Sequence, residues 1–285
     1  MITVSQLYHS YTRDERYSVR DVSFEIGRGE IFGFLGPSGA GKSTTQNILT
    51  GLLVLQKGEV SIDGVPLRNM GSRLFNRMGV CFERANNYRK LTGYENLRFF
   101  AQMYSVPTED PMKLLDSVGL GEAAHRRAGQ YSKGMFHRLN FARSMINRPD
   151  IWFLDEPTAG LDPATADRIK GIIRARQQAG ATVFLTTHDM HIADELCDRV
   201  AFIDEGRLVA MDTPRALKLR YGDRNVCVEY VRDGQPGRET LSLSEDKDKV
   251  RLREILETAT VETMHSQEAT LDRIFIELTG KELGS

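Results

Sequence analysis

A glycine-rich stretch, Gly36-Pro37-Ser38-Gly39-Ala40-Gly41-Lys42-Ser43-Thr44, has the residue types and spacing that suit the binding of phosphates. It fits the pattern G-x-x-x-x-G-K-[ST], and it follows an apolar segment at 31–35 that has the character of a buried strand. Glycines let backbone N–H groups approach an anion, Lys42 can reach the terminal phosphates, and the Ser43 hydroxyl can bind Mg²⁺. A turn without a ligand would need all these features to coincide by chance. The stretch therefore predicts a nucleotide-binding loop.

Two acidic residues and a histidine follow further apolar segments. Asp155 and Glu156 come after the segment 151–154, and His188 comes after the segment 181–187. The carboxyl ends of parallel strands meet at one edge of a sheet, where nucleotides bind in such folds. We expect Asp155 to hold Mg²⁺ through water and Glu156 to polarise an attacking water, with His188 at the same edge. Adjacent acids can instead cap a turn, and a lone histidine is more often structural, but the phosphate loop favours the catalytic interpretation.

An α/β fold with a parallel sheet is needed to bring these segments together. Alternating apolar patterns at 2–7, 19–26 and 59–65 predict an antiparallel β layer around the strand of the phosphate loop. Between residues 85 and 148 the periodicity becomes helical, which predicts a helical subdomain of three helices between two strands of the sheet. The residues after 220 start a new pattern of strands and helices, which predicts a small α+β appendage.

Short polar motifs set the boundaries of several predicted elements. Thr92 and Glu95 have the spacing of a capping box that opens a helix. Three dipeptides that favour tight hairpin turns separate pairs of predicted strands: Asp63-Gly64, Glu205-Gly206 and Asp233-Gly234.

Composition and charge argue against several functions. The 285 residues carry a formal net charge of −1 and no long basic run, so we expect no nucleic-acid partner. No apolar run approaches the ~20 residues that cross a bilayer, and the first residues lack the apolar core of a signal peptide. The cysteines at 81, 197 and 227 are far apart, which predicts reduced core residues in the cytosol. Any membrane role would come through a partner.

The order of the motifs resembles that of the ATP-binding cassette (ABC) family. The phosphate loop and the helical insertion are followed by Tyr-Ser-Lys-Gly-Met at 131–135, Leu-Asp-Glu-Pro at 154–157, Gly-Leu-Asp-Pro at 160–163 and Thr-His-Asp at 187–189. The chain most resembles single-cassette ATPase subunits of bacterial exporters for drugs and antibiotics, and the segment 266–280 is similar to the close of those subunits.

The resemblance implies a P-loop NTPase core and two domains. Residues 1–220 would form the ABC nucleotide-binding domain, with its helical subdomain at about 85–148, and residues 221–285 a C-terminal accessory domain. The function implied is ATP hydrolysis that powers export of a small molecule.

The resemblance also implies a role for each matching residue. Gly36 to Thr44 would form Walker A, Asp155 would close Walker B, and Glu156 would be the catalytic carboxylate. Tyr11 would stack on adenine, although a tyrosine on a surface strand is at least as common. Ser132 and Gly134 would belong to the signature loop, and Asp162 to the loop that communicates across the dimer. His188 would contact the γ-phosphate. The implied cofactors are ATP and Mg²⁺, the metal being held by Ser43, Asp155 and Glu83.

The chain departs from the family pattern at three positions. Lys133 and Met135 replace the first glycine and the glutamine of the common signature, and Glu83 stands where the family has glutamine. A carboxylate at position 83 can still bind Mg²⁺ or water, but its charge must be compensated, and Arg84 can neutralise it.

Two partners follow from the resemblance. A second cassette, in a head-to-tail and ATP-dependent homodimer, would complete each nucleotide site with its signature loop. A membrane-spanning permease subunit would hold the chain on the cytoplasmic face of the cell membrane. An importer subunit, which shares every catalytic motif, remains an alternative. So does a soluble ABC ATPase in a non-transport assembly, although those that act on ribosomes or DNA usually show tandem cassettes or long coiled coils, and this chain has neither. A nucleotide-binding module without turnover is disfavoured by the set of Asp155, Glu156 and His188.

Overall fold

The chain divides into two compact units, the first running from Met1 to Met211 and the second starting at Asp212. The structure is a computed structural model, and it describes residues 1–12, 16–222, 225–267 and 269–281. We expected the boundary after residue 220. It lies earlier because helix α8 (Pro214–Tyr221) packs against α10 (Leu271–Thr279) and so belongs with the C-terminal part of the chain.

A six-stranded sheet forms the centre of the first unit, with the strand order β10-β9-β3-β8-β7-β6. Its strands are β3 (Ile31–Leu35), β6 (Met78–Cys81), β7 (Ile151–Asp155), β8 (Thr182–Thr187), β9 (Arg199–Asp204) and β10 (Arg207–Asp212). The strands from β9 across to β6 pair in parallel. Every residue of β3, β7 and β8 is buried, as expected for strands covered on both faces. The ends of these three strands therefore meet at one edge.

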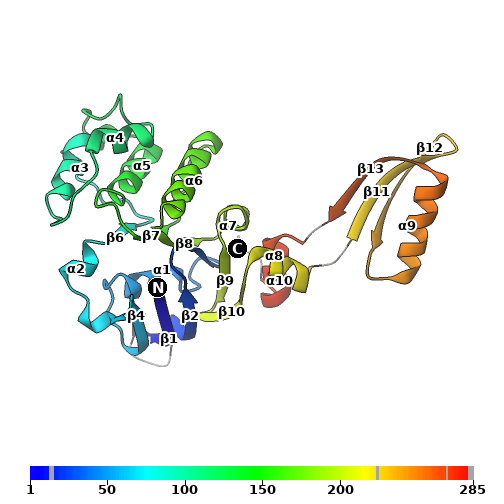
Figure 1. Cartoon of the computed structure of the whole chain (residues 1–285), viewed down its shortest axis with the longest axis horizontal. Helices are drawn as coiled ribbons and strands as arrows, with labels where there is room; N and C mark the ends of the chain where they lie inside the picture. The colour runs from blue at the N-terminus through cyan, green and yellow to red at the C-terminus, as the bar shows by residue number, and fades with distance from the viewer. Residues whose placement is uncertain (13–15, 223–224, 268, 282–285) are drawn as a thin grey trace. The chain divides into compact units, whose positions relative to one another are not determined.

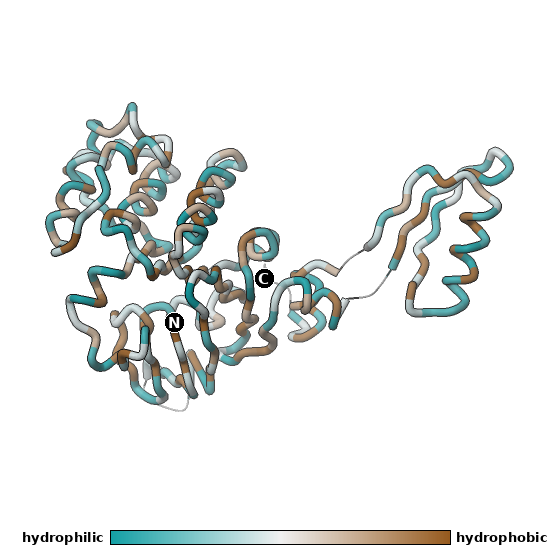
Figure 2. The backbone as a smooth tube through the Cα atoms, viewed as in Figure 1, coloured by the Kyte–Doolittle hydropathy of each residue, from teal (hydrophilic) through white to brown (hydrophobic). Residues whose placement is uncertain are grey.

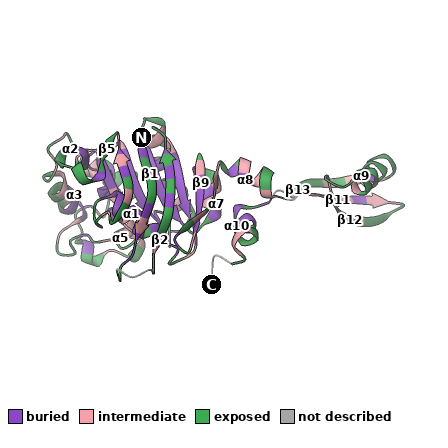
Figure 3. Ribbon diagram, turned by 90° about the horizontal axis from the view of Figure 1, so that it is seen from below, coloured by how far each residue is buried: buried purple, intermediate pink, exposed green. Residues whose placement is uncertain are grey.

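An antiparallel sheet of four strands, in the order β2-β1-β4-β5, forms the second layer. Its strands are β1 (Ile2–His9), β2 (Val19–Ile26), β4 (Lys57–Ile62) and β5 (Val65–Pro66). Buried and exposed residues alternate along β1 and β2, as the colours of Figure 3 show. This alternation confirms the predicted β layer, because a strand with one solvated face must place apolar side chains at every second position.

The three predicted hairpins are present, and all turn in the same way. Both residues of Asp63-Gly64, Glu205-Gly206 and Asp233-Gly234 have positive φ angles, between 46° and 76°. Two successive residues with positive φ give the tight turn whose twist matches that of the flanking strands. Glycine adopts this conformation without strain, and aspartate tolerates it, which explains why the sequence signal was reliable.

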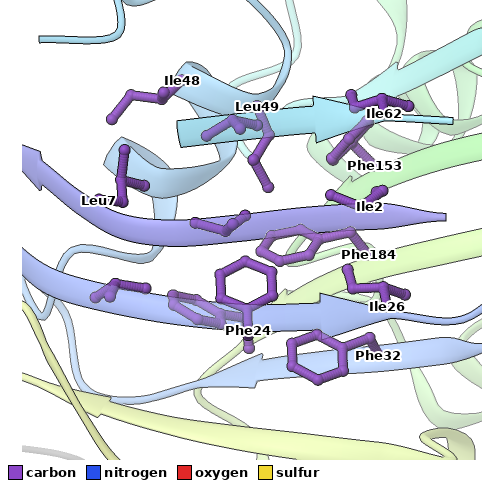
Figure 4. Close-up of a cluster of buried hydrophobic side chains, with 14 of the residues drawn as sticks. Ile2, Leu7, Phe24, Ile26, Phe32, Ile48, Leu49, Ile62, Phe153 and Phe184 are labelled. Atoms are coloured by element: carbon purple, nitrogen blue, oxygen red, sulfur yellow. The ribbon is translucent and has the colours of Figure 1, made fainter. Parts of the chain in front are cut away.

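The inner faces of the two sheets meet in a core with stacked aromatic rings (Figure 4). The ring centroids of Phe24 and Phe32 lie 5.3 Å apart, and those of Phe24 and Phe184 lie 6.1 Å apart. Ile48 and Leu49, from the helix after the phosphate loop, belong to the same cluster. Burial of these two residues fixes that helix, and with it the phosphate loop, against the core.

Helices flank the six-stranded sheet, and three more are inserted between β6 and β7 (Figure 1). The flanking helices are α1 (Lys42–Leu49), α2 (Ser72–Phe75), α6 (Pro163–Gln178) and α7 (Met190–Leu196). The insertion contains α3 (Gly93–Ala101), α4 (Pro111–Ser117) and α5 (Lys133–Arg143), which contact one another. The predicted capping box of α3 is formed, since Glu95 N donates to Thr92 Oγ1 and Thr92 N donates to Glu95 Oε2.

The second unit contains a three-stranded antiparallel sheet in the order β12-β11-β13. Its elements are β11 (Asn225–Arg232), β12 (Gln235–Ser242), α9 (Asp246–Thr258) and β13 (Thr260–Gln267), besides α8 and α10. A small core of Val226, Val228, Tyr230, Leu241 and Ile255 joins the sheet to α9. Hydrophilic residues predominate on the rest of α9 (Figure 2). These elements match the α+β pattern that the sequence predicted.

Two expectations from composition can be compared with the structure. Cys81, Cys197 and Cys227 are free and buried, as expected of core cysteines. Among the described residues, no helix combines the length and the apolar character that spanning a bilayer requires.

Replacing Phe184 by alanine should lower the free energy of unfolding by about 3–5 kcal/mol, because the change leaves a cavity among packed rings. The Phe184 side chain is almost completely buried and also lies against Phe153. Urea denaturation followed by circular dichroism measures the change. The matched control is Phe75→Ala, whose 45% exposed side chain should give a loss of about 1 kcal/mol or less. Equal losses for the two variants would contradict the assigned core.

Candidate active site

The phosphate loop lies between β3 and α1, and close backbone approach explains its glycines. Gly41 has a φ of 110°, and a Cβ atom there would lie 2.5 Å from Ser18 O. A Cβ atom on Gly36 would lie 2.2 Å from Ile203 O. No side chain caps the N-terminus of α1, so its first N–H groups can receive an anion.

Lys42 lies inside the curve of this loop. Its Nζ donates to Gly36 O at 2.7 Å and to Pro37 O at 3.0 Å. Burial lowers the pKa of Lys42, and the nearby carboxylates of Glu156, Asp155 and Glu83 oppose that shift. The positive charge of the Lys42 ammonium group is therefore balanced by three acids at the edge of the sheet.

Asp155 ends β7 and is buried beside the loop. Thr186 Oγ1 donates a hydrogen bond to its carboxylate, and the Ser43 side chain bonds to it as well. Burial raises the pKa of Asp155, while these two hydrogen bonds favour the ionised form and partly oppose the shift. A cation beside Asp155 would stabilise the ionised form of its carboxylate further.

Glu156 is fixed by the end of the neighbouring strand β8. Its Oε2 accepts from Thr187 Oγ1 at 2.9 Å, and its Oε1 accepts from His188 N at 2.9 Å and lies 2.7 Å from His188 Nδ1. Its backbone N donates to Thr186 O at 3.0 Å, with φ at 48°. A positive φ in a residue with a side chain is strained, and such strain clusters at functional sites. The surroundings therefore hold this carboxylate in one orientation.

A single pocket of about 430 Å³ is lined by six of the nine predicted residues of the phosphate loop, together with both acids and the histidine. The pocket is lined by Tyr11, Ser18, Ser38, Gly39, Gly41, Lys42, Ser43, Thr44, Glu83, Asp155, Glu156, Ala159 and His188. Tyr11 is 61% exposed, and its hydroxyl lies 3.2 Å from Thr44 Oγ1, so its ring is available for stacking. Gly36, Pro37 and Ala40 shape the loop without lining the pocket.

Three further predicted residues, which lie outside the phosphate loop, do not line this pocket either. Ser132 and Gly134 line a separate cavity, which shares Glu83 and Ala159 with the first. Ser132 caps α5 by accepting from Met135 N at 3.2 Å, so its hydroxyl proton remains available to donate. Asp162 caps α6 by accepting from Thr165 N at 3.0 Å.

The residues around Asp155 fit a magnesium ion. Mg²⁺ keeps several waters and takes one or two protein oxygens together with phosphates. The hydroxyl of Ser43 and the carboxylate of Asp155 are in contact and supply that number of oxygens. Nowhere in the described part of the chain does a group of three or more His, Cys, Asp or Glu residues offer a metal site made of protein alone.

Comparison with known proteins decides the family. A sequence profile described as "ABC transporter" matches residues 19–159. The chain is 52% identical over 285 residues to a fluoroquinolones export ATP-binding protein of Mycobacterium tuberculosis strain H37Rv, with 99% of this chain and 94% of the relative covered. The chain belongs to the ABC transporter family. It is an ATP-binding subunit with ATPase activity, as the resemblance of its motifs implied.

Other ABC proteins are similar over most of the chain. A daunorubicin resistance ATP-binding protein of Streptomyces coeruleorubidus is 33% identical, with 93% of this chain and 91% of the relative covered. An ATP-binding cassette solved as a dimer in a post-hydrolysis state, bound to ADP and Pi, is 27% identical with a TM-score of 0.68. That comparison covers 75% of this chain and 98% of the cassette. This solved structure confirms the predicted α/β fold of the P-loop NTPases.

Thr186 and Thr187 are site residues that the sequence analysis missed. They end β8 and donate to Asp155 and Glu156, which lie 31 residues earlier. Two adjacent hydroxyl residues directly before His188 were the available signal. Their role depends on the pairing of β7 with β8, which places Asp155 beside Thr186.

Asp155→Asn should raise the free energy of unfolding of the ligand-free chain at pH 7. The pKa of Asp155 is raised in the folded state, so ionisation opposes folding as the pH rises through that pKa. The gain should therefore shrink as the pH falls, and vanish below the ordinary value of 3.8. Urea unfolding between pH 3.5 and pH 7 measures it.

Asp162→Asn is the matched control. Hydrogen bonds from Thr165 lower the pKa of Asp162, so removal of its charge should slightly decrease stability at pH 7. A pH-independent gain in the Asp155 variant would show that burial of the charge is not its cause.

Proposed function

We propose that this chain hydrolyses ATP to power the export of a small molecule through a separate membrane-spanning partner. One observation carries the catalytic part of the proposal. Glu156 is held by Thr187 and His188 at the edge of the sheet, in the same pocket as Lys42 of the phosphate loop. A fixed carboxylate beside a phosphate cradle is the arrangement that in-line attack of water requires.

Each residue of the pocket has a part in the proposed reaction. Glu156 orients the attacking water, and Lys42 and the N–H groups at the start of α1 spread the charge of the phosphates. His188 uses Nδ1 to contact Glu156, which leaves Nε2 on its 54% exposed ring to face the γ-phosphate. A Mg²⁺ ion held by Ser43 and Asp155 would neutralise part of the charge of the phosphates. Glu83 lies at the same pocket and contributes to the metal end of the site.

The separation of Ser132 from this pocket supports a head-to-tail homodimer. One phosphate loop leaves the outer side of the nucleotide open to water. Ser132 and the N-terminus of α5 from a second copy would close that side and donate to the γ-phosphate. The solved cassette bound to ADP and Pi is dimeric, which agrees with the proposed pairing.

The helical insertion offers a surface for the membrane partner. Tyr88, Phe99 and Met103 are 48%, 38% and 60% exposed, and the rings of Tyr88 and Phe99 lie 5.1 Å apart. Exposed apolar clusters of this kind mark interaction sites. The partner would hold the chain on the inner face of the membrane. We propose cargo of the kind named for its relatives, which are associated with fluoroquinolones, daunorubicin and linearmycin.

Tagged protein from gently solubilised native membranes should copurify with a partner that has several apolar segments of ~20 residues. Mass spectrometry identifies that partner. Phe99→Asp should reduce the recovered partner, because a charge in an apolar contact is costly, whereas Val54→Asp should not. Val54 is the control because it is 81% exposed and lies outside the insertion. Recovery of ribosomes or a soluble assembly in place of a membrane protein would refute transport and leave the ATPase standing.

Glu156→Gln should lower kcat by about 10²–10³-fold, because the side chain would no longer polarise water as a carboxylate does. ATP binding should persist, since the cradle and Lys42 are unchanged. The variant should therefore accumulate as an ATP-dependent dimer in size-exclusion chromatography. Glu122→Gln, a change of an exposed acid, serves as the control. Near-normal turnover of the Glu156 variant in the reconstituted complex would disprove the catalytic role.

A further inference from the structure

The segment from Phe82 to Tyr88 carries Glu83 into the nucleotide pocket. It joins the end of β6 to the helical insertion, and Glu83 lines both the pocket of the phosphate loop and the cavity of Ser132. Within the described ranges, the side chains of Glu83 and Arg84 make no hydrogen bond or ion pair. Their position must therefore be set by the residues on either side of them.

Helix α5 holds both ends of the segment 82–88, which we call the arch. Asn140 Nδ2 donates to Phe82 O at 2.8 Å, directly before Glu83. Arg143 Nη2 donates to Asn86 Oδ1 at 2.6 Å, and its Nη1 donates to Asn86 O at 3.3 Å. A third bond follows at once, from Asn87 Nδ2 to Phe136 O of the same helix at 3.1 Å. Only Glu83, Arg84 and Ala85 lie between the anchors.

Arg143 and Asn140 are buried and bonded to each other. Arg143 Nη2 donates to Asn140 Oδ1 at 2.7 Å, and the guanidinium lies 4.6 Å from the ring centroid of Phe100. In the described part of the chain, no carboxylate pairs with Arg143, so amide oxygens and an aromatic face satisfy a buried cation. Burial of a charge costs more than burial of an apolar side chain of similar size. Stability alone therefore does not explain an arginine at this position.

We infer that Asn140 and Arg143 are positioning residues that set Glu83 in the nucleotide pocket and tie it to α5. The inference rests on the proposed function, because it assigns Glu83 a part in ATP hydrolysis. Helix α5 begins at the cap residue Ser132, which is proposed to contact the nucleotide of the second copy. Any movement of α5 as a rigid body would then move both anchors and, with them, Glu83 in its own pocket.

A double-mutant cycle tests whether Arg143 acts through Glu83. Arg143→Lys keeps the charge and loses the fork that binds Asn86, and it should lower kcat about tenfold in the otherwise unchanged chain. In a Glu83→Ala background the same change should lower kcat less than about twofold, since the group to be positioned is gone. An equal loss in both backgrounds would overturn the inference, because it would mean a general structural effect.

Arg77→Lys is the matched control for the loss of an anchoring arginine. Arg77 bonds to Asp150 at 3.0 Å and to Asp63 at 2.6 Å, before the start of β6. Its replacement should reduce the stability of the chain and change kcat by the same factor whether or not Glu83 is present.

Nuclear magnetic resonance relaxation tests the anchoring without any measurement of activity. In the ligand-free chain, Arg143→Lys and Asn86→Ala should each lower the backbone order parameters at 83–86 from about 0.85 toward 0.6, and Arg77→Lys should not. Unchanged order parameters at 83–86 would overturn the inference even if the variants were less active. If the wild-type chain failed to hydrolyse ATP, the proposed function would fall, and the relaxation result would still decide whether α5 positions the arch.

Discussion

The pairing of β7 with β8 is the constraint on which the candidate site depends. Parallel register places Asp155 beside Thr186, so the hydroxyls of Thr186 and Thr187 meet the two acids at the end of β7. Buried carboxylates are costly unless they are hydrogen-bonded or paired with a cation. A shift by one residue would turn each of these side chains to the opposite face of the sheet, and the two acids would lose the threonine donors.

The phosphate loop depends on the same core. Ile48 and Leu49 pack between the two sheets, and this fixes α1 relative to β3. The start of α1 and the buried Lys42 supply positive potential, while three acids oppose the loss of the lysine proton. The core thus brings opposite charges to one edge before any nucleotide is present. A nucleotide site prearranged in this way needs little rearrangement when phosphates bind.

Local signals explain what could be predicted from the sequence. The bounds of β2 and β3 were predicted because alternation and a continuous apolar run are properties of adjacent residues. The partners of Asn140 and Arg143 could not be predicted in this way, since Asn86 lies 57 residues before Arg143. Helix α8 was missed for a similar reason: Leu217 is its one fully buried apolar side chain, and its contact with α10 is distant in the sequence. The roles of the site residues remain proposals.

The division of the site residues between two cavities has a mechanical consequence. A catalyst assembled from one chain alone would hydrolyse ATP whenever it bound, and transport could not be tied to turnover. Here Ser132 lies in a separate cavity, at the start of the helix that anchors the arch of Glu83. Contact of Ser132 with a second copy would therefore also act, through α5, on the nucleotide pocket of the copy that carries Ser132. Because α3, which carries the exposed Phe99, contacts α5, the same movement would reach the surface proposed for the membrane partner.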